Sequence, residues 1–312
     1  MENVNLYIAF CGNSNTCSLD TMTSFLMLQK LLSEQDIKYN FGFQLNISND
    51  PAFVKNAAIS NFLANENYTH ILFISDNIRF SPQDVIKLLN RNLDVVGAIG
   101  NSGNYYWQKL FSAPTPEKIV KYADIIKQAP NDAKSTIINK IASELRAEML
   151  LYNIELFPEA KVNENGLLEV KSMTSDFLLC TRKVITSMTN YFAYRKMSNG
   201  NDPNPNLYNL FRFDVVEGKY LSDDFIFCKQ LRECNLKIFA DVSVNLTRCG
   251  NEKYDGNFIL ASGNSQDFGT RKTPETKPKE IITDEPIENA ADNATENNST
   301  TENNSSKMEQ VD

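Results

Sequence analysis

The chain has 312 residues, of which 42% are hydrophobic, so it is long and apolar enough to bury a sizeable core. Its formal net charge is −8, and much of the acidic excess lies near the C-terminus, so no nucleic-acid partner is expected. The six cysteines show no C-x-x-C spacing and lie mostly in apolar runs, which is typical of reduced, buried thiols. No apolar run reaches the roughly 18 residues of a membrane span, and the start has no basic leader. We therefore expect a cytoplasmic chain without a membrane span.

The first hundred residues alternate between apolar strands and amphipathic helices. Strands are predicted at 6–10, 39–45, 69–74 and 95–99, and helices at 19–33, 51–64 and 82–90. This alternation predicts a Rossmann-like α/β fold with a mostly parallel sheet. The sequence has no G-x-G-x-x-G motif after the first strand and no G-x-x-x-x-G-K-[ST] motif. The motifs typical of dinucleotide-dependent redox enzymes and of P-loop phosphoryl transferases are therefore missing.

The remainder of the chain has a different pattern. Residues 115–150 read as two helices separated by 129–131, which indicates a helical insertion. Strands are then predicted at 166–170, 172–180, 211–216, 237–241 and 244–247, helices at 182–188 and 221–233, and a loop at 199–209. From about residue 264 large apolar side chains are almost absent, so this tail is predicted to be disordered.

Residues 73–89, FISDNIRFSPQDVIKLL, form the first candidate site. A buried strand ends at Asp76 and Asn77, and a helix follows with Ser81 as N-cap and Pro82 in its first position. Polar groups at the carboxyl end of such a strand lie where open α/β sheets bind ligands. A carboxylate and an amide oxygen suit Mg²⁺ or Mn²⁺ holding a diphosphate, whereas Asp-Asn is also a common turn pair. Both interpretations are open at this point.

Residues 220–250 form the second candidate site. Ser222 is placed to cap a helix whose first turn contains Asp223 and Asp224. Acidic residues at a helix N-terminus stabilise the helix dipole, and this accounts for at least one of the pair. A partly buried carboxylate beside another acid is also typical of a general base.

These two segments, in this order and about 140 residues apart, resemble the two signatures of GT-A-type nucleotide-sugar glycosyltransferases. The similarity is closest to the group found in bacteriophages and large DNA viruses. FISDNIRFSPQDVIKLL is followed by DVVGAI at 94–99, and SDDFIFCKQLRECNLKIFADVSVNLTRCGNEKYDG ends at Gly256. Residues 168–185 also resemble the strand before the acceptor-side helix of that family, so the resemblance covers residues 4 to about 258, with gaps around the insertion.

The resemblance implies a GT-A-like domain at 1–262, with a Rossmann-type, mostly parallel central sheet flanked by helices. Its parts would be a nucleotide-binding half at 1–100, the helical insertion at 115–150 and an acceptor and catalytic half at 165–260. The disordered tail would occupy 263–312. For a viral chain, the expected location is the host cytoplasm.

The resemblance also implies a function, the transfer of a sugar from a nucleotide-diphosphate donor to an acceptor hydroxyl with inversion of configuration. Asp224 would be the general base, and Asp223 would orient the acceptor. The acceptor class, whether glycan, protein or lipid, is left open.

The same resemblance assigns the donor side of the site. Lys55, Asn56, Asp76, Asn77 and Arg248 would bind the nucleotide sugar. Asp76 and Asn77 would hold a divalent cation, Mn²⁺ or Mg²⁺. Solvated surface charge is the alternative interpretation of the Lys55 and Arg248 side chains.

The chain departs from the family at two positions. The D-x-D motif falls on Ser75, Asp76 and Asn77, so only its middle residue is acidic, and the family's late histidine falls on Arg248. A guanidinium binds phosphate bidentately, which suits a metal-independent transferase and equally a decayed one. The chain's one histidine, His70, lies on a core strand, where a structural role is expected.

Two further interpretations stay open: a non-catalytic GT-A-like binding or scaffold protein, and an α/β enzyme of another nucleotide-using class. Convergence of Asp76, Asp224 and Arg248 on one open cleft would favour the transferase.

Overall fold

The structure is a computed structural model that describes residues 4–12, 16–45, 48–111, 115–197 and 206–262. These residues belong to one compact unit. The predicted tail and most of the predicted loop at 199–209 lie outside the described residues. All six cysteines are free thiols, as expected. Among the described helices, none combines the length and apolar character that a membrane crossing requires.

An eight-stranded sheet with the order β2-β1-β3-β10-β5-β13-β9-β8 forms the centre of the fold. Its strands are β1 Asn5–Gly12, β2 Lys38–Leu45, β3 His70–Ser75, β5 Val95–Gly97, β8 Ile154–Leu156, β9 Leu167–Met173, β10 Phe177–Thr181 and β13 Ile238–Asp241. The pairs β1–β2, β1–β3 and β5–β13 are parallel, and the other neighbouring pairs are antiparallel. The expected mostly parallel sheet is thus corrected to a mixed one, because β9 and β10 run against the other strands.

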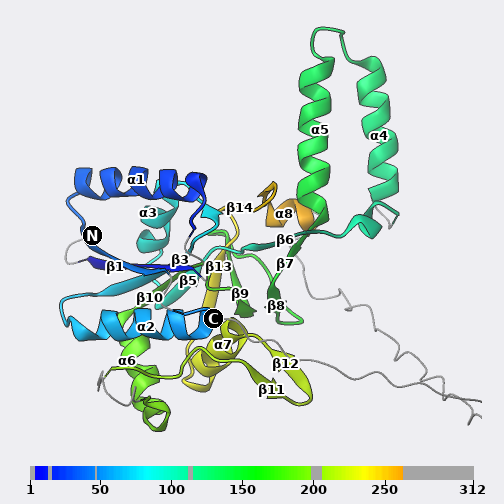
Figure 1. The fold of residues 1–312 in the computed structure, drawn as a ribbon. Helices are drawn as coiled ribbons and strands as arrows, with labels where there is room; N and C mark the ends of the chain where they lie inside the picture. Colours follow the sequence, from blue (N-terminus) through cyan, green and yellow to red (C-terminus); the bar gives the residue numbers. More distant parts are fainter. Residues whose placement is uncertain (1–3, 13–15, 46–47, 112–114, 198–205, 263–312) are drawn as a thin grey trace, which may run out of the picture. The chain divides into compact units, whose positions relative to one another are not determined.

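Helices cover both faces of this sheet, which confirms the α/β class (Figure 1). The helices α1 Leu19–Glu34 and α3 Pro82–Asn90 pack on one face, and α2 Pro51–Ala64, α6 Arg182–Tyr191 and α7 Asp223–Glu233 pack on the other. The strand sequences explain this arrangement, because alternate side chains point to opposite faces. In β1, Leu6, Ile8 and Phe10 pack with α1 and α3, whereas Tyr7, Ala9 and Cys11 pack with α2, α6 and α7.

The smaller elements lie outside this sheet. A three-stranded sheet consists of β4 Ile78–Arg79, β14 Thr247–Cys249 and β15 Lys253–Asp255. Two further sheets have two strands each. They are β6 Asn101–Tyr105 with β7 Leu150–Tyr152, and β11 Asp214–Val216 with β12 Lys219–Leu221. Short helices occur at η1 Trp107–Phe111, η2 Ala193–Arg195 and α8 Phe258–Ala261.

The predicted helices within 115–150 are observed as α4 Thr115–Gln128 and α5 Lys134–Met149 (Figure 1). Polar contacts join them, since the Tyr122 hydroxyl donates to Glu144 at 3.0 Å and Lys118 pairs with Glu148 at 2.9 Å. The aliphatic side chains Ile119, Val120, Ile125 and Ile138 remain exposed.

Two strand predictions were misplaced. The break predicted at residue 171 lies instead at Thr174–Asp176, between β9 and β10. The last predicted strand, 244–247, is shifted to β14 because Val244 and Leu246 are core residues of the loop before it.

Candidate functional site

A cleft of about 600 Å³ opens at the carboxyl ends of β1 and β3. Open α/β sheets bind their ligands at this edge. The first turns of α2 and α7 and the strand β14 border the cleft. Six of the seven predicted site residues line it: Lys55, Asp76, Asn77, Asp223, Asp224 and Arg248.

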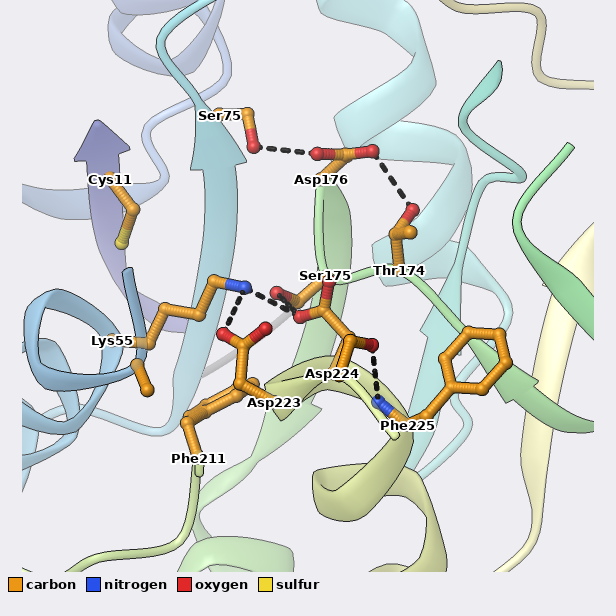
Figure 2. A network of polar contacts seen from close by, with 12 residues as sticks. Cys11, Lys55, Ser75, Thr174, Ser175, Asp176, Phe211, Asp223, Asp224 and Phe225 are labelled. Atoms are coloured by element: carbon orange, nitrogen blue, oxygen red, sulfur yellow. Dashed lines mark hydrogen bonds and ion pairs between the residues drawn. The ribbon is translucent and has the colours of Figure 1, made fainter. Parts of the chain in front are cut away.

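The two acidic residues of α7 share the ammonium group of Lys55 (Figure 2). Lys55 Nζ lies 2.9 Å from Asp223 Oδ2 and 2.6 Å from Asp224 Oδ1. The Ser175 hydroxyl also donates to Asp224 Oδ1, at 2.5 Å. Ser222 caps α7 by accepting a hydrogen bond from the Phe225 amide at 3.4 Å, which fixes the turn that carries both carboxylates.

Burial raises the pKa of Asp224 above its ordinary value of 3.8, although Lys55 lowers it, and the neighbouring Asp223 and Asp176 add to the rise. Burial lowers the pKa of Lys55, but the carboxylates of Asp224 and Asp223 outweigh this effect and hold it above its ordinary value. Lys55 is therefore protonated, and Asp224 is a better proton acceptor than an exposed aspartate.

The Asp76–Asn77 turn is held through its backbone. The Asp76 amide donates to the Cys11 carbonyl at 3.0 Å, and the Asp76 carbonyl accepts from the Ser18 amide at 3.2 Å. The Asn77 carbonyl accepts from the Cys249 amide at 2.7 Å. The turn therefore links β1, the N-cap of α1 and β14, and it presents the Asp76 side chain to the cleft.

A close approach at Gly12 makes room for this carboxylate. A Cβ atom at Gly12 would lie 2.2 Å from Asp76 Oδ2, so a side chain there would displace Asp76. Burial raises the Asp76 pKa, Arg248 partly opposes the rise, and Asp176 adds to it.

Arg248 is bound on three sides rather than solvated. Its Nη1 lies 3.0 Å from Asn77 Oδ1, its Nε donates to the Asn101 carbonyl at 2.6 Å, and its Nη2 pairs with Asp176. The antiparallel pairing of β14 with β4 explains the first contact, because Arg248 lies opposite Ile78, the residue after Asn77. The surface-charge interpretation therefore fails for Arg248, and it fails for Lys55 as well.

Asp176 is a site residue that the sequence reasoning missed. It is 9% exposed and accepts hydrogen bonds from Ser75 at 2.7 Å and Thr174 at 2.9 Å, besides its ion pair with Arg248. The loop Thr174–Asp176 thus joins the two charged clusters, since Ser175 contacts Asp224 (Figure 2). The available signal was Thr-Ser-Asp, three polar residues that interrupt an apolar run.

Metal ligands are sparse in this cleft. Within the described part of the chain, no cluster of three or more His, Cys, Asp or Glu side chains is arranged to hold a metal ion. Asn77 offers its side-chain oxygen to Arg248. Asp76 forms no ion pair with another described residue, so its carboxylate is the available oxygen donor.

Asn56 does not line the cleft. Its side chain is 1% exposed, and its Oδ1 accepts from the amides of Leu210 at 3.0 Å and Phe211 at 2.9 Å, while its Nδ2 donates to the Phe211 carbonyl at 2.8 Å. His70 lies at the start of β3, at the opposite end from Asp76, and its Nδ1 is 2.8 Å from the Thr69 hydroxyl. Burial lowers the His70 pKa.

No protein-family model matches the chain, and no curated protein sequence does. Among solved structures, the crystal structure of A197 from STIV is similar, with 14% sequence identity and a TM-score of 0.39 over 81% of this chain and 95% of that one. A likeness of this degree carries no argument about function.

Proposed function

We propose that the chain is a GT-A-like glycosyltransferase that uses a nucleotide-diphosphate sugar as donor. The observation that carries the proposal is the convergence of Asp76, Asp224 and Arg248, which are far apart in the sequence, on one open cleft. A protein that bound no ligand would have no need to keep this volume clear of side chains.

Asp224 is the general base in this proposal. The acceptor hydroxyl oxygen attacks the anomeric carbon of the donor, and its proton passes to Asp224. The bond between that carbon and the diphosphate oxygen breaks, and its electron pair leaves with the nucleoside diphosphate. Asp223, on the same helical turn, orients the acceptor. Attack from the face opposite the leaving group inverts the configuration.

Lys55 and Arg248 stabilise the negative charge that develops on the departing diphosphate. Both line the cleft in a largely buried setting, where such electrostatic stabilisation is strongest. When Lys55 turns toward the diphosphate it also releases Asp224, so donor binding prepares the base.

The charge balance of the cleft supports a divalent cation accompanying the donor. Four aspartates, Asp76, Asp176, Asp223 and Asp224, face two basic side chains, and a diphosphate adds further negative charge. Mg²⁺ is usually held by one or two carboxylates together with substrate phosphates, and Asp76 fits that mode. A cation bound there would neutralise the diphosphate.

The ion pairs of Lys55 favour a second candidate, a nucleotide-binding protein without transferase activity. The ammonium group neutralises Asp223 and Asp224 together, and a fixed pairing of this kind would leave no base for catalysis.

Donor consumption tests the proposal. The purified chain is incubated with uridine-, guanosine-, cytidine- and thymidine-diphosphate sugars, and released nucleoside diphosphate is measured. We expect the wild type to consume a donor, and we expect the rate of Asp224→Asn to be at least about 100-fold lower. Asp20→Asn, an aspartate outside this cleft that pairs with Lys253, is the matched control and should match the wild type. Nucleotide binding without donor consumption would favour the second candidate.

A further inference from the structure

The β11–β12 hairpin turns an aromatic face toward solvent. Phe213, Val215 and Tyr220 are 41%, 64% and 69% exposed. Val215 lies opposite Tyr220 in the hairpin, and Phe213 is two residues before Val215, so the three side chains share one face. Asp214, Val216 and Leu221 on the other face are partly buried. The hairpin thus keeps Val216 and Leu221 on its less exposed face and also has large apolar side chains on its solvent face, which indicates a binding surface.

The rings of Phe213 and Tyr220 stack in parallel, offset planes, and we call this exposed pair the aromatic plate. The ring centroids of Phe213 and Tyr220 are 5.8 Å apart, and the ring planes differ by 7°. A stable protein interface buries roughly 800 Å² on each partner and involves about 20–30 residues, far more than this plate offers. The plate therefore suits a small ring-shaped ligand. The C–H face of a sugar ring packs on such a surface while its hydroxyls stay available at the ring edge.

The plate is tied to the elements that carry the site. Asn56, next to Lys55 on α2, and Gln230 of α7 hold the segment at Leu210 where it enters the hairpin. Tyr220 is three residues before Asp223, so their Cα atoms are at most about 10 Å apart. Figure 1 shows the hairpin beside α7. A ring on the plate would lie within a short oligosaccharide's reach of Asp224.

We infer that Phe213 and Tyr220 form a subsite for a sugar ring of the acceptor, so that the acceptor is a carbohydrate. The inference rests on the proposed function for its catalytic meaning, since it assigns the acceptor class of the same site. Binding of carbohydrate to the plate can nevertheless be measured without turnover.

A glycan array probed with the labelled full chain, with and without nucleoside diphosphate, tests this inference. The wild type should bind a related set of glycans, and Phe213→Ala and Tyr220→Ala should each weaken this binding by about tenfold or more. Tyr220→Phe keeps the ring and should retain binding. Tyr194→Ala removes a 74% exposed tyrosine from η2 and is the matched control.

Several outcomes would overturn the inference. One is the absence of any glycan signal with the wild type, and another is unchanged glycan binding by Tyr220→Ala. A loss of nucleotide binding in Tyr220→Ala would assign the plate to the donor. A change from dimer to monomer in light scattering of Tyr220→Ala would assign the face to self-association instead. Failure of the transferase proposal can be told apart from failure of this inference. In that case the wild type neither binds a nucleotide nor consumes a donor, whatever the glycan array shows.

Discussion

Asp224 and Asp223 hold one buried ammonium group between them, and this contact makes the acid–base behaviour of the site testable. Burial raises the Asp224 pKa, and a base acts only when ionised, so turnover should rise as pH increases through that raised value. The Ser175 hydroxyl stabilises the ionised form by donating to it. Ser175→Ala should therefore shift the acidic limb of the kcat/KM profile to higher pH.

This prediction is checked by kcat/KM measured from about pH 4 to about pH 8. Ser81→Ala, a serine outside the cleft, serves as control. A Ser175→Ala limb that coincides with that of the wild type, or moves to lower pH, would remove Asp224 from the role of base.

Arg248 uses three nitrogen atoms on three different acceptors, and a lysine cannot reproduce this geometry. Arg248→Lys should therefore weaken nucleoside diphosphate binding by about tenfold, measured by calorimetry. Arg79→Lys on the neighbouring strand β4 is the control, because Arg79 is exposed and outside the cleft. Equal affinity of Arg248→Lys and wild type would contradict a direct role for the guanidinium.

Asp76 offers a third test at this scale. If its carboxylate holds a cation delivered with the diphosphate, Mn²⁺ should strengthen nucleotide binding in the wild type. Asp76→Asn should lose that gain while keeping its metal-free affinity, and Asp84→Asn, an aspartate outside the cleft, should behave like the wild type. An undiminished Mn²⁺ effect in Asp76→Asn would place the cation elsewhere.

The residues that the sequence could identify are those that follow local signals. Asp76 follows a buried strand, and Asp223 and Asp224 follow a helix cap, so the neighbouring residues in the sequence predict each of these positions. Asp176 was missed because the apolar strand pattern continues on both sides of its short loop, so its local signal was only the three polar residues Thr-Ser-Asp. The contacts of Asn56 with residues 210–211 depend on packing between distant segments, which no local pattern encodes.

At the level of elements, helix boundaries were more predictable than strand order. The first residues of α2 and α3 match the prediction because Pro51 and Pro82 occupy their first turns after capping residues. The insertion of β10 between β3 and β5 and the pairing of β4 with β14 depend on long-range packing. The turn between β11 and β12 was not predicted, because Glu217 has a φ of 52° and glutamate rarely adopts this left-handed conformation.

The anchoring of the hairpin segment gives a stability prediction. Asn56→Ala would leave two buried amides and one carbonyl without partners, so we expect the free energy of unfolding to fall by roughly 2–4 kcal/mol. Urea unfolding measures this change. The exposed Asn67→Ala should stay within about 0.5 kcal/mol of the wild type. A similarly small effect of Asn56→Ala would show that the segment is held by other contacts.

Across the whole molecule, the cleft exists only when both parts of the chain assemble around the central sheet. The first hundred residues supply Lys55 and Asp76, and the later residues supply Asp176, Asp224 and Arg248. A ligand that contacts both sets should therefore stabilise the whole described domain, because it binds the folded chain and not the unfolded one.

The most direct test of the central claim is a thermal-shift measurement on the full chain with uridine, guanosine, cytidine and thymidine diphosphates, each with Mn²⁺ or with a chelator. At a concentration of about 100 times Kd, one nucleotide should add about 2.7 kcal/mol of stability and raise Tm by roughly 5–10 °C. The shift should be smaller in Arg248→Lys. If none of the four diphosphates raises the Tm of the wild type, with or without Mn²⁺, the cleft is not a nucleotide-sugar site.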